Sequence, residues 1–254
     1  RDTHLKLEPV IPPGTPWFEF TGQYDPKSPW SDTRVRLAAN YAFNRQAINE
    51  AETLGYSVLS GSIVPRKFDY ALALEPYPYD PKKARELLKA AGHANGFDAG
   101  EVSGDSNFVW MMEALVNDLM AVGIRVKVRA MERAAAFAAH REKTFKNLAF
   151  HGSGAFGNAA TRLGTFVYSK GAEAWIKDPE IDAWYEQQVV ERDRTKRQDL
   201  LYKIQQKLYD EARFMPIWEH CFLCASGPRA AVSGLSLIAL FAYSGPYEDV
   251  RVKS

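Results

Sequence analysis

The stretch SDTRVRLAANYAFNR, residues 31–45, carries the strongest structural signal in this chain. Ser31 and Asp32 can accept hydrogen bonds from the unpaired backbone N–H groups of a first helical turn. Six apolar residues then recur at helical spacing and predict a stripe that faces a core: Val35, Ala38, Ala39, Ala42, Phe43 and Ala47. The polar residues of the stretch fall largely outside this stripe: Arg34, Arg36, Asn40 and Arg45. The pattern therefore predicts one well-capped amphipathic helix.

The same stretch resembles the most recognisable segment of the family 5 extracellular solute-binding proteins, the receptors of dipeptide, oligopeptide and nickel ABC importers. In that family the segment looks like D-x-R-V-R-x-A-x-x-Y-A-x-x-R. The matching positions here are Asp32, Arg34, Val35, Arg36, Ala38, Tyr41, Ala42 and Arg45. A second block, from Tyr77 to Phe97, is similar to the family's Y-x-Y-D-P-x-K-A-x-x-L-L-x-x-A-G-x-x-N-G-F. Two blocks in the expected order make the resemblance specific.

The resemblance implies an α/β fold, namely lobe II of a type II periplasmic-binding-protein-like (bilobal) fold with remnant strands of lobe I. Residues 24–214 are then expected to form lobe II. Residues 1–23 and 215–254 are expected to be inter-lobe crossing segments and lobe I remnants. Because family members are longer and carry a signal peptide, we expect this chain to be the C-terminal portion of a longer protein. An isolated lobe would expose apolar surface, which favours self-association of the fragment.

The composition argues against several broad classes of protein. With 254 residues, 46% of them hydrophobic, the chain can bury a sizeable core and form one or two domains. Its net charge of +1, with acids and bases interspersed, does not provide the basic surface that binds nucleic acid or anionic membrane. No apolar run approaches the roughly 20 residues that span a bilayer. Cys221 and Cys224 lie in a predicted strand, where residues three apart face opposite sides, so we expect no disulfide between them.

Periodicity predicts a βαβ unit in the middle of the chain, with a strand at 97–102, a helix at 107–122 and an alternating strand at 124–130. Asp80, followed directly by Pro81, predicts the start of a helix that ends at Gly92. Further helices are predicted at 131–140, after Pro179 and at 195–212, and further strands near 17–20 and at 148–150, 214–225 and 235–241.

The loop FHGSGAFGN, residues 150–158, is the richest candidate for ligand binding. It matches G-x-G-x-x-G, but the apolar strand and acidic residue that complete a dinucleotide site do not follow, which argues against a nucleotide-dependent oxidoreductase. In peptide-binding relatives this loop carries an Asp that pairs with the ligand's α-amino group, and Asn158 falls near that position. Since no nearby acid replaces the Asp, we expect a neutral polar or anionic ligand. The candidate contacts are His151, Ser153, Phe156, Asn158 and Arg162, the last of which equally suits an exposed helix surface.

A second turn, GDSNFVW at 104–110, follows the first strand of the βαβ unit. Ligands of open α/β sheets bind outside the carboxyl ends of the strands, so we expect this turn to converge with the glycine-rich loop. Asn107 and Trp110 are its candidate ligand contacts. Trp110 equally suits simple packing of the following helix.

Catalysis and metal binding find no support in the sequence. The five histidines lack metal-ligand spacing, Ser153 and His151 have no neighbouring acid that would orient a base, and no cofactor is predicted. The resemblance implies the substrate-binding component of an ABC importer, which captures a small solute between two lobes and delivers it to a permease in the inner membrane. It implies a periplasmic protein, or an extracellular, membrane-anchored one in a Gram-positive bacterium. The alternative is a ligand-sensing module of a regulatory protein that uses the same fold.

Overall fold

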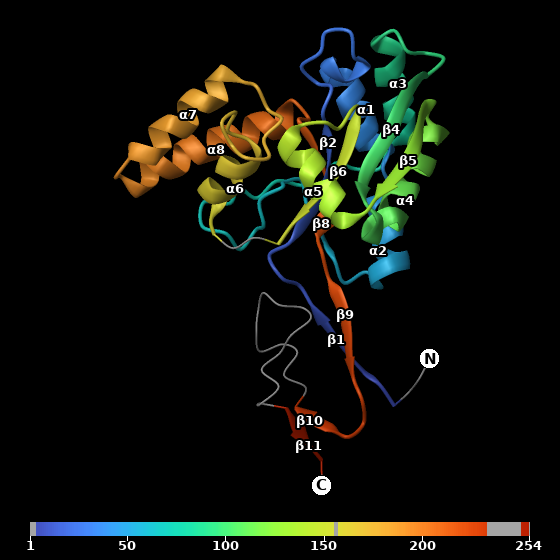
Figure 1. Ribbon diagram of the computed structural model, residues 1–254, viewed down its shortest axis with the longest axis vertical. Coiled ribbons are helices and arrows are strands. Elements are labelled where there is room, and N and C mark those ends of the chain that lie inside the picture. The colour runs from blue at the N-terminus through green and yellow to red at the C-terminus, as the bar shows by residue number, and fades with distance from the viewer. Residues whose placement is uncertain (1–3, 155–156, 233–249, 254) are drawn as a thin grey trace.

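The computed structural model describes residues 4–154, 157–232 and 250–253. A body of helices packed around a sheet occupies one end of the molecule, and a long two-stranded ribbon leads away from it (Figure 1). The helices are α1 (Thr33–Ala42), α2 (Arg45–Thr53), α3 (Pro81–Ala90), α4 (Val109–Ala121), α5 (Arg133–Glu142), α6 (Ala159–Phe166), α7 (Pro179–Val190) and α8 (Arg194–Asp210), with 3-10 turns η1 (Pro29–Ser31) and η2 (Ser106–Phe108). The strands are β1 (Lys6–Val10), β2 (Thr15–Phe20), β3 (Val58–Leu59), β4 (Phe97–Asp105), β5 (Ile124–Met131), β6 (Leu148–Ser153), β7 (Phe214–Pro216), β8 (Trp218–Glu219), β9 (Phe222–Ser226), β10 (Ala230–Val232) and β11 (Arg251–Val252).

The central sheet has the strand order β5-β4-β6-β2-β7. β4 runs parallel to β5 and to β6, whereas β2 runs antiparallel to both β6 and β7. The parallel pair β4 and β5, joined through α4, confirms the predicted βαβ unit. β4 extends three residues beyond the predicted end at Val102, and α4 starts at Val109 because η2 comes between. The carboxyl ends of β4 and β6 thus lie next to each other.

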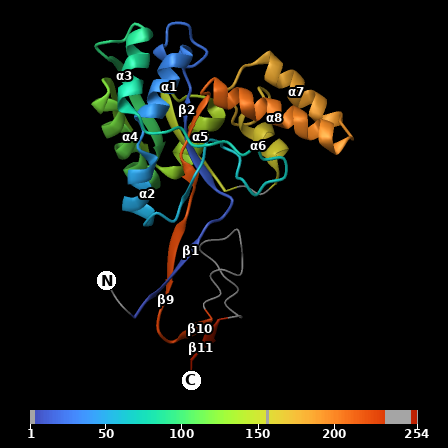
Figure 2. The ribbon, with the colours of Figure 1, turned by 180° about the vertical axis from the view of Figure 1, so that it is seen from behind.

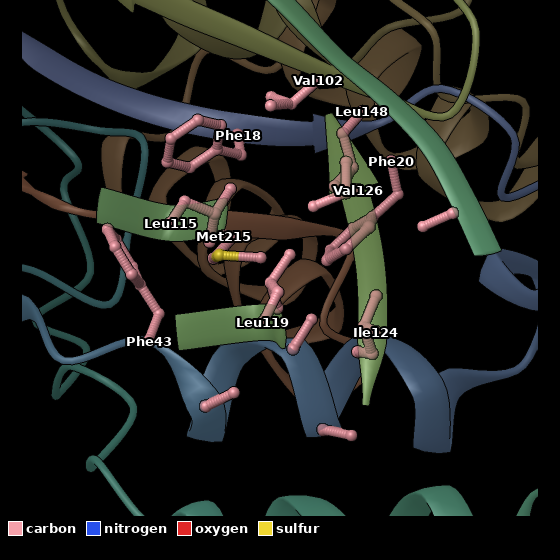
Figure 3. Packing of buried hydrophobic residues seen from close by; sticks show 14 of the residues in the cluster. Phe18, Phe20, Phe43, Val102, Leu115, Leu119, Ile124, Val126, Leu148 and Met215 are labelled. Atoms are coloured by element: carbon pink, nitrogen blue, oxygen red, sulfur yellow. The ribbon is translucent and has the colours of Figure 1, made fainter. Parts of the chain in front are cut away.

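β2 is buried at every position because helices cover both faces of the sheet. Trp17 packs into a cluster formed with α6, α7 and α8, whereas Phe18 and Phe20 pack into the main core with α1, α3 and α4. Figure 2 shows these two groups of helices on opposite sides of the sheet. Figure 3 shows the main core, in which Phe18 and Met215 of neighbouring strands lie close to Leu115 of α4. One strand therefore supports two separate cores through alternate residues.

The single helix predicted from residues 31–45 is two helices. Asp32 caps α1 as expected, since its side chain accepts a hydrogen bond from the Arg34 N–H. The chain then leaves helical geometry at Phe43 and Asn44. Asn44 caps α2 by accepting from the Ala47 N–H, and its own N–H donates to Asp118 at 2.8 Å. A second cap inside the apolar stripe therefore divides the segment.

Three polar residues of this segment, predicted to lie outside the buried stripe, are among the most buried in the chain. Arg36, Asn40 and Arg45 are each at most 2% exposed. Arg36 donates to the carbonyl oxygens of Trp30 and Glu211, at 2.7 and 2.8 Å. Asn40 donates to Phe214, and Arg45 donates to Pro216 and to the Asn40 side chain. Burial of these side chains is offset because they donate to backbone carbonyls along residues 211–216.

The strand predicted at 214–225 is three short strands with three different partners. β7 pairs with β2 in the main sheet, β8 pairs with β3, and β9 pairs with β1 to form the ribbon. Cys221 lies between β8 and β9 and Cys224 within β9, and no disulfide joins the two cysteines. The strand predicted at 235–241 lies outside the described residues. Within the described ranges, no helix is both long enough and apolar enough to cross a membrane.

We expect Arg45→Met to destabilise the fold by about 2–4 kcal/mol, because it leaves the carbonyls of Pro216 and Asn40 buried without a donor. Burial lowers the pKa of the Arg45 guanidinium to about 10, so the group remains charged at neutral pH. Arg125→Met, at an exposed position of β5, is the matched control and should change stability by less than about 0.5 kcal/mol. Equal midpoints of denaturant unfolding for the two variants would contradict this account.

Candidate functional site

An open cavity of about 440 Å³ lies at the carboxyl ends of β4 and β6. α5 forms one side of it, and the segments that precede β2 and begin β9 form the other. Its lining residues are Pro12, Gly14, Thr15, Pro16, Asp105, Phe108, Arg133, Ala136, Phe137, His140, Phe150, His151, Gly152, Ser153, Gly154, His220 and Phe222. The turn after β4 and the end of β6 therefore meet at one site, where ligands of open α/β sheets usually bind.

A chain of imidazoles forms the inner wall of the cavity. His140 Nε2 lies 3.1 Å from the Phe150 carbonyl oxygen, to which it donates, and His140 Nδ1 lies 3.1 Å from His151 Nδ1. His151 Nε2 lies 3.2 Å from a carboxylate oxygen of Glu173, and its ring stacks on Trp17 at 4.7 Å. All four imidazole nitrogens of the two histidines thus have partners within the protein.

Burial controls the charge of these histidines. It lowers the pKa of His140 to about 3, and the nearby His151 acts in the same direction. Burial also lowers the pKa of His151, although the hydrogen bond with Glu173 opposes this shift. On the opposite side of the cavity, burial lowers the pKa of His220 to about 4. At neutral pH His140 and His220 are therefore uncharged.

A buried acid lies on the same strand as Trp17. Glu19 has no exposed surface, and neither of its carboxylate oxygens has a hydrogen-bond partner among the described residues. Burial raises its pKa well above the usual range, the charge of Glu173 adds to the increase, and Lys143 opposes it. Burial therefore favours the protonated form of Glu19.

Two of the predicted contacts, His151 and Ser153, line the cavity. Asn158 instead caps α6 by accepting from the Thr161 N–H, and it borders a separate, shallower groove between α6 and α7. Asn107 and Trp110 do not line the cavity. Trp110 stacks on Trp218 with ring centroids 6.3 Å apart, which agrees with the packing alternative. Phe156 lies outside the described residues.

Arg162 is buried rather than exposed on a helix surface, so the surface alternative is wrong. It is 2% exposed and lies over the rings of Trp17, Phe68 and Phe166. Its Nη2 donates to the Ser153 carbonyl oxygen at 3.1 Å, whereas Nε and Nη1 have no partner among the described residues. Burial lowers its pKa to about 10. Arg162 therefore supports the end of β6 from behind the cavity wall.

Several lining residues were not predicted from the sequence. Asp105 and Arg133 follow the neighbouring strands β4 and β5 and form an ion pair at 4.0 Å. Phe137 lies on α5 and remains 39% exposed, as several other large apolar side chains do, so its exposure alone did not point to a site. His220 and Phe222 come from the far end of the chain. Among the described residues, no three His, Cys, Asp or Glu side chains gather in a way that would hold a metal ion.

Comparison with known proteins identifies similar chains. The model of the bacterial extracellular solute-binding proteins, family 5 (middle region), matches residues 5–174. The glutathione-binding protein GsiB of Escherichia coli (strain K12) is 38% identical over 108 residues, which make up 42% of this chain and 21% of that protein. NikA from Brucella suis, solved in complex with Fe(III)-EDTA, superposes with a TM-score of 0.83 at 23% identity and covers 99% of this chain and 53% of that one. A putative peptide-binding protein, AppA from Clostridium difficile, superposes with a TM-score of 0.79 at 20% identity and the same coverage.

The chain spans about half the length of these solved proteins, and its match to the curated relative covers about a fifth of that protein. At these identities the superpositions establish the α/β fold of the solute-binding proteins.

We expect acid to destabilise the fold through His140. The folded pKa of about 3 lies below the value of about 6.5 for an unfolded histidine, so the unfolded state binds the proton more readily. Above pH 6.5 the His140 imidazole makes its full contribution to the free energy of unfolding. It should fall by up to about 1.4 kcal/mol for each pH unit as the pH decreases towards 3.

His140→Gln should remove this contribution, so unfolding in denaturant at pH 7, 6 and 5 should show a shallower loss of stability than in the unmodified chain. Glu19 acts in the opposite direction, since its raised pKa makes stability fall as pH rises, but it contributes equally to both proteins. Val190→Gln, at a 77% exposed position of α7, introduces no titratable group and should keep the original slope. The same slope in His140→Gln would show that this imidazole is not held neutral by burial.

Proposed function

The chain belongs to the bacterial extracellular solute-binding proteins of family 5, and we propose that its cavity is one wall of the site at which a small solute is captured for an ABC importer. The observation that carries this proposal is the cavity at the carboxyl ends of β4 and β6. It is large enough for a small molecule, it is open to solvent, and it combines apolar walls with a few polar groups. Binding, rather than chemistry, is what this arrangement supports.

The proposed division into lobes keeps residues 24–214 as lobe II. Residues 1–23 and 215–254 would be the crossing segments and remnants of lobe I. In support, β1 and β9 leave the body together as an antiparallel ribbon (Figure 1). The same two segments contribute Pro12, His220 and Phe222 to the cavity. A movement of the ribbon would therefore change the shape of the site.

Capture would follow from closure of a second wall over the solute. A solute shifts such an equilibrium only as far as it binds the closed form more tightly than the open form. The solute would be released to an ABC permease in the membrane, and the protein would act in the periplasm or at the cell surface. Self-association of this chain through its exposed apolar residues remains a prediction.

The proposed ligand contacts differ in how closely they approach the cavity. His151 and Ser153 are on its wall and are the first candidates. Phe156, Asn158 and Arg162 belong to the segment that follows β6, where Arg162 would orient the Ser153 backbone. Of the sequence-based candidates after β4, Asn107 would act from the rim, beside Asp105, whereas Trp110 packs on Trp218.

We expect isothermal titration calorimetry against dipeptides, tripeptides, glutathione and small organic acids to show at least one solute that binds with 1:1 stoichiometry. Gly152→Leu should weaken that binding at least tenfold, because Gly152 lines the cavity and a Cβ there has ordinary contact distances of 3.9–4.0 Å. Gly227→Leu is the matched control. Gly227 is exposed in the turn after β9, a Cβ there has no neighbour within 4 Å, and binding should change less than twofold.

The two variants should unfold at the same temperature within about 2 °C, which separates loss of binding from loss of folding. Unweakened binding in Gly152→Leu would place the solute elsewhere. If no screened solute bound the unmodified chain, the proposed function would fail for this chain.

A further inference from the structure

We propose that the cavity selects solutes that carry an uncharged aromatic or branched aliphatic group, and that this group occupies the space between α5 and the ends of β4 and β6. The inference rests on the proposed function and adds to it the chemical class of the solute. It replaces the sequence-based expectation of a neutral polar or anionic ligand, which was drawn from the loop at 150–158 alone.

Several aromatic rings line the cavity. Four phenylalanines, contributed by η2, α5, β6 and β9, line it: Phe108, Phe137, Phe150 and Phe222. The rings of Phe108 and Phe150 lie 5.1 Å apart at a tilt of 33° and form a continuous apolar wall. Phe137 on α5 is still 39% exposed. An apolar group that enters the cavity removes both its own surface and these rings from water, which is the main source of affinity in such sites.

The polar side chains of the wall already have partners in the protein. The ring nitrogens of His140 contact the Phe150 carbonyl oxygen and His151, and those of His151 contact His140 and the Glu173 carboxylate. His220 Nδ1 accepts a hydrogen bond from the Trp218 indole, and the Thr15 hydroxyl donates to the Ile63 carbonyl oxygen. Apart from the Nε2–H of His220, these groups have little hydrogen-bonding capacity left for a solute. They contribute to the cavity mainly as ring and methyl surface.

The charged side chains of the cavity are confined to one ion pair. Asp105 and Arg133 lie 4.0 Å apart, and the Arg133 side chain is 67% exposed, so the pair is in contact with solvent. Asp105 also accepts a hydrogen bond from the Asn107 N–H. Arg162, although nearby, is not among the residues that line the cavity. A carboxylate placed beside Phe108 and Phe150 would lose its water, which is unfavourable. Arg133, the one Lys or Arg among the lining residues, lies over the Phe137 ring at 5.6 Å and already faces the Asp105 carboxylate.

The protonation of the histidines agrees with this geometry. Burial lowers the pKa values of His140 and His220 to about 3 and about 4, so neither is an imidazolium at neutral pH. No cationic ring is therefore available on these two sides to attract an anion.

Three probes with identical backbones test this inference: the N-acetyl amides of L-phenylalanine, L-leucine and L-glutamate at pH 7. Their ends are uncharged, so only the side chain differs. Chemical-shift titration of the ¹⁵N-labelled chain gives each dissociation constant. The phenylalanine probe should bind at least tenfold more tightly than the glutamate probe, with the leucine probe between them.

Phe137→Gln should weaken binding of the phenylalanine probe at least threefold, because it replaces an exposed ring of the cavity wall with a polar side chain. Val190→Gln, at a 77% exposed position of α7 outside the cavity, is the matched control and should leave the affinity unchanged. Because both side chains are substantially exposed, neither substitution should disturb the core.

Equal or tighter binding of the glutamate probe would overturn the proposed selectivity while leaving solute capture in place. Absence of binding by the phenylalanine probe up to 50 mM would overturn it as well. The Gly152→Leu calorimetry then decides the proposed function separately, because it uses whichever solute binds and does not depend on the side-chain preference.

Discussion

Two buried guanidinium groups join helices α1 and α2 of this protein to residues 211–216. Arg36 and Arg45, with Asn40 between them, donate to backbone carbonyls along residues 211–216. A guanidinium offers five donors in a fixed fork, so one side chain satisfies several carbonyls that would otherwise be buried unpaired. These contacts attach α1 and α2 to β7. Because β7 pairs with β2, and β2 with β6, they also fix the strand whose last residues form the cavity wall.

The two faces of the central sheet pack against different sets of side chains. This difference explains why the cavity wall presents few polar atoms. On the side of α1, α3 and α4 lies the main apolar core, and the buried polar side chains of α1 and α2 are paired with backbone carbonyls. On the other side, beside Trp17, the structure places the imidazole chain, Glu173 and the buried Glu19. Polar groups buried in this way must pair with one another or remain uncharged. The result is a cavity wall that contains titratable residues and yet presents few polar atoms to a solute.

Short sequence patterns predicted most of the helices and strands. Contacts between residues far apart in the chain determine which polar side chains are buried and where a predicted strand is divided. The Asp80 cap, with Pro81 behind it, and the βαβ unit were predictable because their causes lie within a few residues. The burial of Arg36 and Arg45 was not, because the carbonyls that they satisfy are about 170 residues away. The division of 214–225 into three strands was missed for the same reason, since each piece pairs with a different strand. Of the site, His151 and Ser153 were predictable from their loop, whereas His220 joins them only through the topology of the ribbon.

The central claim is that a solute binds where the ends of β4 and β6 meet the crossing segments. Hydrogen–deuterium exchange of the chain with and without a bound solute tests this claim most directly, because it reports every segment in one measurement. When a solute is bound, we expect slower backbone amide exchange at residues 105–108, 133–140, 150–153 and 220–222. Exchange in α3 and α7 should be unchanged. Slower exchange confined to residues 158–165 and 185–197, which border the groove between α6 and α7, would contradict it.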